Sequence, residues 1–79
     1  MLSQPSDLEI TANIKQKLMD DTSLSAGAKR ISVTTEHGVV TLKGSVATKH
    51  ESYRVVSLVE EVPGVIRVRN QLFISHSLE

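Results

Sequence analysis

The segment that most constrains the fold is an alternating stretch interrupted by a two-residue turn. Residues 31–36 and 39–44 largely alternate apolar and polar side chains, and His37-Gly38 separates the two runs. Alternation with period two predicts strands with one buried face, and a two-residue connection containing glycine predicts a β-hairpin. The turn sets a register with three cross-strand pairs: Thr35–Val40, Val33–Leu42 and Ile31–Gly44. This register agrees with the pattern, because it brings four apolar side chains onto one face: Ile31, Val33, Val40 and Leu42.

The residues before the hairpin predict an amphipathic helix over 7–20. Its apolar residues recur every four positions: Ile10, Ile14 and Leu18. Polar residues fill the positions between them, which is the pattern of a helix with one buried face. Ser6 or Asp7 is expected to be the N-cap. Residues 23–30 are predicted to form a loop in which Leu24 reaches the edge of the core.

A second helix is predicted over about 48–61, with Ser45 or Thr48 available as its cap and Pro63-Gly64 as its stop. Its apolar face is wide: Tyr53, Val55, Val56, Leu58, Val59 and Val62. Valine forms helices weakly, so burial against the rest of the domain must stabilise this segment.

A third strand is predicted over 65–74. Alternation assigns five residues to the inner face: Ile66, Val68, Asn70, Leu72 and Ile74. The other five are assigned to the outer face: Val65, Arg67, Arg69, Gln71 and Phe73. The order αββαβ predicts an α+β fold, a two-layer sandwich with both helices on one face of a three-stranded sheet. Placing the third strand beside the second gives a mixed sheet, which we favour, whereas placing it beside the first gives an antiparallel sheet.

Composition excludes several classes of function. The chain has 79 residues, which is one small domain, and a formal net charge of zero. Zero net charge and two aromatic residues, Tyr53 and Phe73, argue against nucleic acid as a partner. Cysteine is absent, which removes disulfides, thiolate metal sites and thiol nucleophiles. The sequence contains no nucleophile–base pair or metal-ligand spacing, so it predicts no enzyme, no catalytic residue, no metal and no cofactor.

Two segments carry a resemblance to a known family. The first spans residues 31–46 and contains Gly38, Val40, Leu42 and Gly44 in a G-x-V-x-L-x-G pattern. The second spans 62–72 and reads P-G-V-x-x-V-x-N-x-L, carried by Pro63, Gly64, Val65, Val68, Asn70 and Leu72. Together, and with the opening helix, they resemble the BON domain, named for bacterial osmotically inducible and nodulation proteins. The resemblance covers about 7–74, in a single copy.

The resemblance implies a non-catalytic binding module that associates with phospholipid or the cell envelope in bacterial osmotic or envelope stress. It also implies a periplasmic or envelope-associated location. The segment Met1–Asp7 has neither the basic nor the apolar region of a signal peptide, so a cytoplasmic location also fits. Residues 1–6 are expected to be a disordered N-terminal segment. Residues 75–79 are expected to be a tail whose final Leu78-Glu79 is consistent with a cloning remnant.

Three cations are predicted to gather on the sheet face away from the helices. Alternation places Arg67 and Arg69 there, and Lys43 joins them if the second and third strands are neighbours. The same face is expected to carry apolar Val39, Val65 and Phe73, and one opposing charge, Glu36. Such a face suits an anionic surface such as lipid headgroups, and Lys43, Arg67, Arg69 and Phe73 are the candidate binding residues. An ordinary solvated face is the competing interpretation.

The remaining polar residues have structural interpretations. Asn70 in an inward position must satisfy its amide, and the backbone of the 20–30 loop or a bulge is the expected partner. His37, His50 and His76 lie on separate elements, and the pairs Asp20-Asp21 and Glu60-Glu61 are expected to diverge into solvent at helix ends.

Two alternatives to lipid binding remain at this point. One is protein interaction or self-association, with another BON domain or a domain of the host protein, through the open sheet face or the edge of the third strand. The less favoured alternative is K⁺ sensing through backbone carbonyls, which has no sequence signature here.

Overall fold

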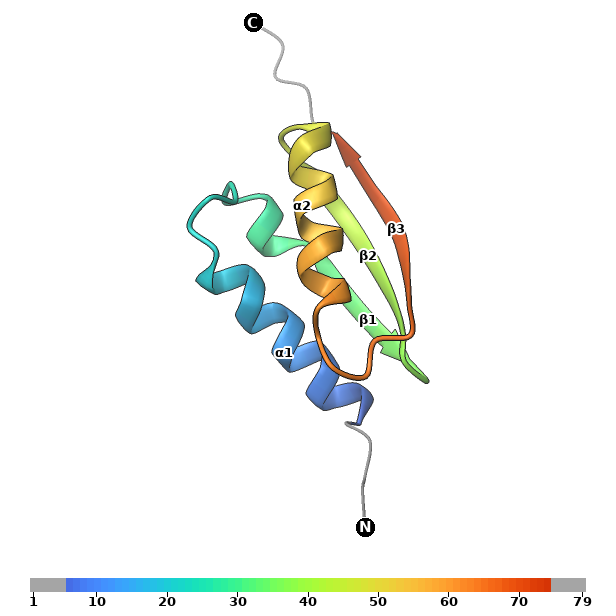
Figure 1. Ribbon diagram of the computed structural model, residues 1–79. Helices are drawn as coiled ribbons and strands as arrows, with labels where there is room; N and C mark the ends of the chain where they lie inside the picture. Colours follow the sequence, from blue (N-terminus) through green and yellow to red (C-terminus); the bar gives the residue numbers. More distant parts are fainter. Residues whose placement is uncertain (1–5, 75–79) are drawn as a thin grey trace, which may run out of the picture.

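The predicted hairpin forms two of the three strands of the sheet (Figure 1). Strand β1 (Ser32–Glu36) pairs antiparallel with β2 (Val39–Val46), and the predicted register is confirmed by the pairs Thr35–Val40 and Val33–Leu42. Both turn residues have positive φ, 52° at His37 and 83° at Gly38. Positive φ at both central positions is the geometry of a type I′ turn, whose twist matches that of the flanking strands.

The computed structural model describes residues 6–74. The expected disordered segment 1–6, apart from Ser6, and the expected tail at 75–79, including His76, therefore lie outside the described residues. Residue Ser6 is the N-cap of the first helix.

Strand β3 (Arg67–Ile74) lies beside β2 and runs parallel to it, so the sheet is mixed, in the order β1-β2-β3. The favoured arrangement of the third strand is confirmed. Helix α2 (Lys49–Glu60) connects β2 to β3 and covers the sheet, as expected for a crossover between parallel strands. The N-cap of α2 is Thr48, whose hydroxyl accepts a hydrogen bond from the Glu51 N–H at 3.0 Å.

Helix α1 (Asp7–Asp20) begins at a capping box. The Ser6 hydroxyl accepts from the Glu9 N–H at 3.1 Å, and the Ser6 N–H donates to Glu9 Oε1 at 3.0 Å. Two donors that the first helical turn leaves free are satisfied in this way. The predicted bounds of the helix and its buried stripe are both confirmed.

The core fills the space between one layer of two helices and the sheet (Figure 1). It combines the apolar stripe of each helix with the inward side chains of the strands: Ile10, Ile14, Leu18, Val55, Val59, Val33, Val40, Leu42 and Val46. The segment between α1 and β1 adds Leu24, as predicted, and Ala28, which begins a short 3₁₀ helix at Ala28–Arg30. The predicted α+β two-layer architecture is therefore confirmed.

Three assignments of inward and outward positions were wrong. Tyr53, expected on the apolar face of α2, is 64% exposed. Ile66, expected inside, is 76% exposed, whereas Val65, expected on the open sheet face, is half-buried against the core. The strand begins at Arg67 rather than at residue 65, so period-two alternation does not extend to the two residues that close the connection from α2.

The hairpin turn is fastened to two other parts of the molecule. The carboxylate of Asp7, in the first turn of α1, accepts from the N–H groups of His37 at 2.9 Å and Gly38 at 3.2 Å. The carbonyl of Gly38 accepts from the Ile66 N–H at 2.8 Å, just before β3. The beginning of α1 therefore lies at the turn, while β3 ends beside Val46, at the far end of the sheet (Figure 1).

Replacing Gly38 with alanine is expected to destabilise the fold by about 1–3 kcal/mol. A Cβ at residue 38 would sit 2.7 Å from Ile66 Cδ1 and 3.0 Å from the Gly64 carbonyl oxygen, at a φ that disfavours side chains. Urea denaturation of Gly38→Ala measures this cost. The matched control is Gly27→Ala, where φ is −62° and the nearest atom lies at 3.4 Å, so the free energy of unfolding should change by no more than about 0.5 kcal/mol. Equal losses in the two variants would contradict this account.

Candidate functional site

The face of the sheet away from the helices carries a ladder of mostly polar side chains. Residues paired across the strands share a face, so the register defines its rungs. The first three rungs cross all three strands: Glu36–Val39–Arg67, Thr34–Thr41–Arg69 and Ser32–Lys43–Gln71. The fourth rung joins Ser45 to Phe73. We call the surface formed by these residues the open face.

The three predicted cations lie together on the open face. Arg67, Arg69 and Lys43 occupy successive rungs, which are two residues apart and so separated by about 7 Å along the strands. All three are exposed. Both ion pairs found in residues 6–74 lie elsewhere, at Lys17–Glu61 and Arg54–Asp21, so none of the three has a carboxylate within 4.0 Å.

The charges of the described residues are unevenly distributed. Glu36 is the one carboxylate on the strands, against three cations. It lies on β1, two strands away from Arg67 on the same rung, a separation of about 10 Å. The other carboxylates of residues 6–74 lie on or next to the helices. A chain with zero net charge therefore has a positive sheet face.

Phe73 adds an apolar contact to the open face. Its side chain is 62% exposed, next to the rung of Lys43. Val39 is half-buried on the first rung, and Val65, also expected here, instead packs against the core. The open face thus combines cations with one exposed aromatic ring.

Asn70 lies at the outer rim of the sheet. Its Nδ2 donates to the Ser52 hydroxyl of α2 at 3.2 Å, and its Oδ1 accepts from the Leu72 N–H of its own strand at 2.9 Å. The expected backbone hydrogen bond is present, but the expected location was wrong. Asn70 is exposed rather than buried, and its partners are Ser52 and Leu72 rather than the 20–30 loop.

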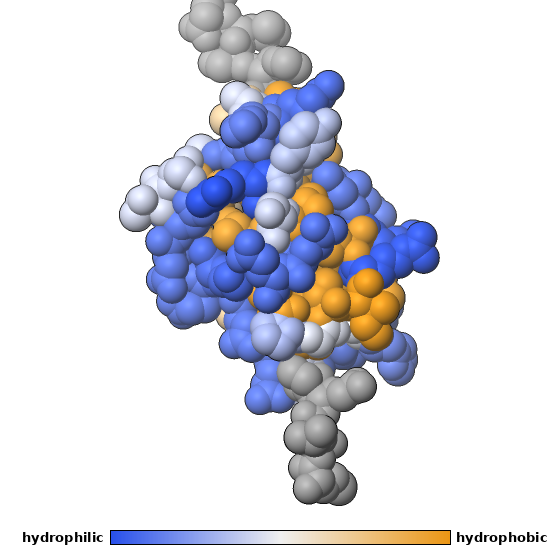
Figure 2. All heavy atoms as spheres, viewed as in Figure 1, coloured by the Kyte–Doolittle hydropathy of each residue, from blue (hydrophilic) through white to orange (hydrophobic). Residues whose placement is uncertain are grey.

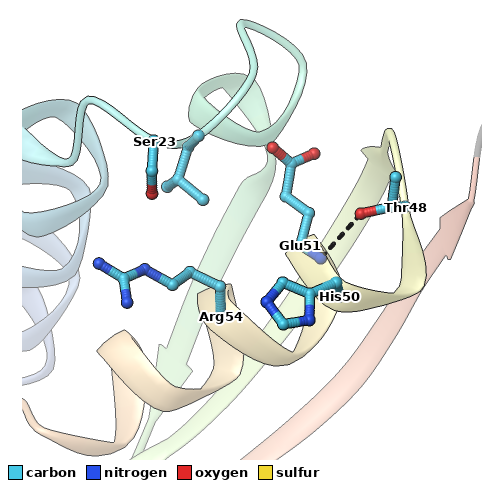
Figure 3. A pocket seen from close by; sticks show the side chains of 6 residues that line it. Ser23, Thr48, His50, Glu51 and Arg54 are labelled. Atoms are coloured by element: carbon cyan, nitrogen blue, oxygen red, sulfur yellow. Dashed lines mark hydrogen bonds between the residues drawn. The ribbon is translucent and has the colours of Figure 1, made fainter.

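A shallow pocket of about 350 Å³ opens at the beginning of α2 (Figure 3). Its lining comes from the loop after α1 and the first turns of α2: Ser23, Leu24, Thr48, His50, Glu51 and Arg54. The acidic and guanidinium groups in this lining already have partners within the chain. The pocket therefore belongs to a clasp that holds the loop to the helix.

Glu51 makes one half of the clasp. Its Oε2 accepts from the Ser25 N–H at 2.6 Å, and its Oε1 accepts from the Ser25 hydroxyl at 2.9 Å and the Ala47 N–H at 2.8 Å. Burial raises the pKa of the Glu51 carboxyl, but the hydrogen bonds from Ala47 and Ser25 together lower it by more. The pKa of Glu51 therefore lies below its usual value.

Asp21 and Arg54 make the other half. Asp21 was expected to be solvated, but its side chain is only 8% exposed. The Ser23 hydroxyl donates a hydrogen bond to the Asp21 carboxyl and lowers its pKa most, and the Ser23 N–H adds to this effect. The Arg54 guanidinium, 3.0 Å away, lowers the pKa of Asp21 further. The sequence pattern did not predict this contact, because Asp21 and Arg54 are 33 residues apart along the chain.

Comparison with protein families gives the same result as the motifs. A family model described as the BON domain matches residues 6–75, which is nearly the whole chain. The chain belongs to the BON domain family. It contains a single copy of the domain. A search of curated proteins finds no match to the chain.

Membership places the chain in a family of non-catalytic binding modules associated with osmotic and envelope stress. Within residues 6–74, no three histidine or acidic side chains are grouped to hold a metal ion. None of the helices in that part of the chain is long and apolar enough to cross a membrane.

The motif residues of this BON domain fall into three positions in the fold. Val40 and Leu42 are fully buried core residues, and Val65, Val68 and Leu72 pack half-buried against the core. Gly38 and Gly44 allow close approaches: a Cβ on Gly44 would lie 3.0 Å from Ile31, at a φ of 141°. The remaining motif residues lie at the end of α2 and at the rim of the sheet: Pro63, Gly64 and Asn70.

Besides Asp21, sequence reasoning missed two carboxylates that fasten elements together. Asp7 was considered only as a cap of α1, yet it binds the hairpin turn. Glu51 occupies the third position of α2, which normally favours a hydrogen bond back to the cap. In this BON domain its carboxylate instead reaches Ala47 and Ser25.

The Glu51→Gln variant is expected to lose about 1–2 kcal/mol of stability at pH 7, because an amide replaces a carboxylate that accepts three hydrogen bonds. A depressed pKa contributes stability that is present above the unfolded pKa and lost as pH falls through the folded value. The difference between wild type and variant, measured by urea denaturation, should therefore shrink below about pH 4.5, the ordinary value of a glutamate. A difference that does not change from pH 7 to pH 3 would contradict the assignment.

Proposed function

We propose that this BON domain binds anionic phospholipid headgroups through the open face, and that it does so at the bacterial envelope. The observation that supports the proposal is the cluster of Lys43, Arg67 and Arg69 on successive rungs, exposed and without a carboxylate within 4.0 Å among residues 6–74. Three such cations attract an anionic membrane by about 1 kcal/mol each.

The distribution of charge favours one orientation on a membrane. The helices carry most of the carboxylates of the described residues, while the strands carry three cations against Glu36. The helical layer also carries cations that nearly balance its carboxylates, so an anionic surface would attract the sheet more strongly than the helical layer. This orientation needs no net positive charge on the domain.

The exposed ring of Phe73 supports the same face. It is 62% exposed beside the Lys43 rung, so both side chains meet an approaching surface together. The apolar ring of a phenylalanine inserts at the boundary between headgroups and acyl chains, and flanking cations then meet the phosphates. Attraction through these residues gives peripheral, salt-sensitive binding.

The double variant Arg67→Glu/Arg69→Glu is expected to bind anionic vesicles about tenfold more weakly or worse, because two attractions of about 1 kcal/mol become repulsions. Cosedimentation with phosphatidylcholine vesicles, with and without phosphatidylglycerol, measures the binding. The control is Lys15→Glu/Lys49→Glu, which makes the same change in net charge at exposed positions on α1 and α2. The control should retain most of the binding.

Three outcomes would overturn all or part of the proposal. Equal losses in the two double variants would mean that net charge, rather than the open face, governs attachment. NMR titration with anionic micelles adds the location: shifts on α1 instead of Lys43, Arg67, Arg69 and Phe73 would keep lipid binding and reject the open face. Absence of binding to either vesicle by the wild type would reject lipid as the ligand.

A further inference from the structure

The residues along the outer edge of β3 are complementary to those of a second copy of the same strand. Strand β3 is at the edge of the sheet, is eight residues long, and has no neighbouring strand on its outer side within residues 6–74. The other edge strand, β1, has five residues and is tied to α1 by a hydrogen bond between the hydroxyls of Thr11 and Thr35 at 2.8 Å. An edge that presents free backbone groups is a template for another strand.

The Leu72 N–H shows which residues present their backbone at this edge. It donates to the Asn70 side chain and so points away from β2. Backbone groups alternate in direction along a strand, so Val68 and Asn70 also present theirs at the edge. The Asn70 Oδ1 thus accepts the Leu72 N–H, a backbone donor that an added strand would need.

We infer that a second copy of this chain pairs with the β3 edge, antiparallel and about a two-fold axis at Asn70, to form a six-stranded sheet. Antiparallel pairing about that axis places facing residues at positions that sum to 140. The resulting pairs on the open face are Arg67–Phe73 and Arg69–Gln71, and those on the helix side are Val68–Leu72 and Asn70–Asn70.

Charge complementarity selects this register. Each Arg67 meets an aromatic ring, a favourable cation–π contact, and each Arg69 meets an amide. An axis at Arg69 would instead place two guanidinium groups opposite each other, which is unfavourable. An axis at Gln71 would leave Arg67 without a partner among the described residues of the second copy.

Apolar side chains along β3 also favour a second copy of the chain as the partner. Val68, Leu72 and Ile74 of β3 pack against the core but are only half-buried. In Figure 2 the helix side is mostly hydrophilic, and apolar surface gathers where the connection from α2 to β3 lies. Pairing would cover these side chains with the same side chains of the second copy.

Pairing exchanges hydrogen bonds rather than losing them. The Asn70 Oδ1 releases the Leu72 N–H, which then donates to Val68 of the second copy, and the Asn70 amide remains near Ser52. The joined sheet would carry three cations from each copy on one continuous open face. This self-association does not depend on lipid, so it stands or falls separately from the proposed function.

Sedimentation velocity in lipid-free buffer with 150 mM salt, about the physiological ionic strength, tests the inference. The average mass should rise from 8.6 kDa toward twice that value between about 10 µM and about 1 mM, the range of small transient interfaces. A wild type that remains monomeric up to 1 mM would overturn the inference, whatever the vesicle experiments show.

Two variants with the same charge change test the register. Asn70→Asp keeps an acceptor for the Leu72 N–H but places two carboxylates opposite each other at the axis, so the dissociation constant should rise about fivefold or more. Gln71→Glu places its charge opposite Arg69 of the second copy, so association should be retained or strengthened. Thermal unfolding of both variants checks that the domain is still folded.

Other results would contradict the inference in distinct ways. Association weakened by Gln71→Glu but not by Asn70→Asp would move the axis to Gln71 and reject the register. Association unaffected by both variants would mean that another surface holds the copies together. Equal weakening by both would indicate a general charge effect instead of strand pairing.

Discussion

The two-residue hairpin turn is the junction on which the rest of the domain depends. Its N–H groups bind the Asp7 carboxylate at the start of α1, and its Gly38 carbonyl binds the N–H before β3. One turn thus positions a helix and a strand that are distant in sequence. Because Asp7 precedes the buried stripe of α1 and Ile66 precedes β3, both contacts fix where the following element begins. A glycine is needed here, since neighbouring atoms leave no room for a Cβ.

The sheet gives its two faces different chemistry. The inner face is occupied by core residues, and the clasp of Glu51, Asp21 and Arg54 closes the loop over one end of that core. The open face receives no helix, so its cations have no internal partners among residues 6–74. Because the strands carry three cations and one carboxylate, a neutral domain has a directional charge. Family membership establishes a binding module, and this distribution of charge suggests what it binds.

Local pattern was sufficient for most of the fold. The hairpin register followed from the turn and the alternation, and α1 followed from Ile10, Ile14 and Leu18, because each depends on neighbours within a few residues. The parallel placement of β3 was favoured but not decided by the sequence. Alternation failed at Val65 and Ile66, where the chain bends before the strand begins. At Asn70 it predicted the side of the sheet but not the exposure, because a strand at the edge lacks a neighbour to bury it.

The site was less predictable than the fold, and the reason is physical. Period two was enough to assign Lys43, Arg67, Arg69 and Phe73 to the open face once β2 and β3 were neighbours. The carboxylate contacts of Asp7, Asp21 and Glu51 span 26 to 33 residues along the chain, so no local pattern contains both partners. Their acidic side chains had ordinary local explanations, as caps or solvated helix ends. Only the tertiary arrangement distinguishes a fastening carboxylate from a solvated one.

The opposite placement of the two ends of the described chain has a mechanical consequence. The chain enters beside the hairpin turn and leaves at Ile74, beside Val46 at the far end of the sheet. Tension applied between these ends acts along the strands, and the parallel β2–β3 hydrogen bonds then carry the load together as shear. Bonds loaded together resist force better than bonds peeled one after another. Tension at the end of β3 is therefore spread along the whole strand, whereas tension at the start of the domain falls on α1 and on the contact of Asp7 with the hairpin turn.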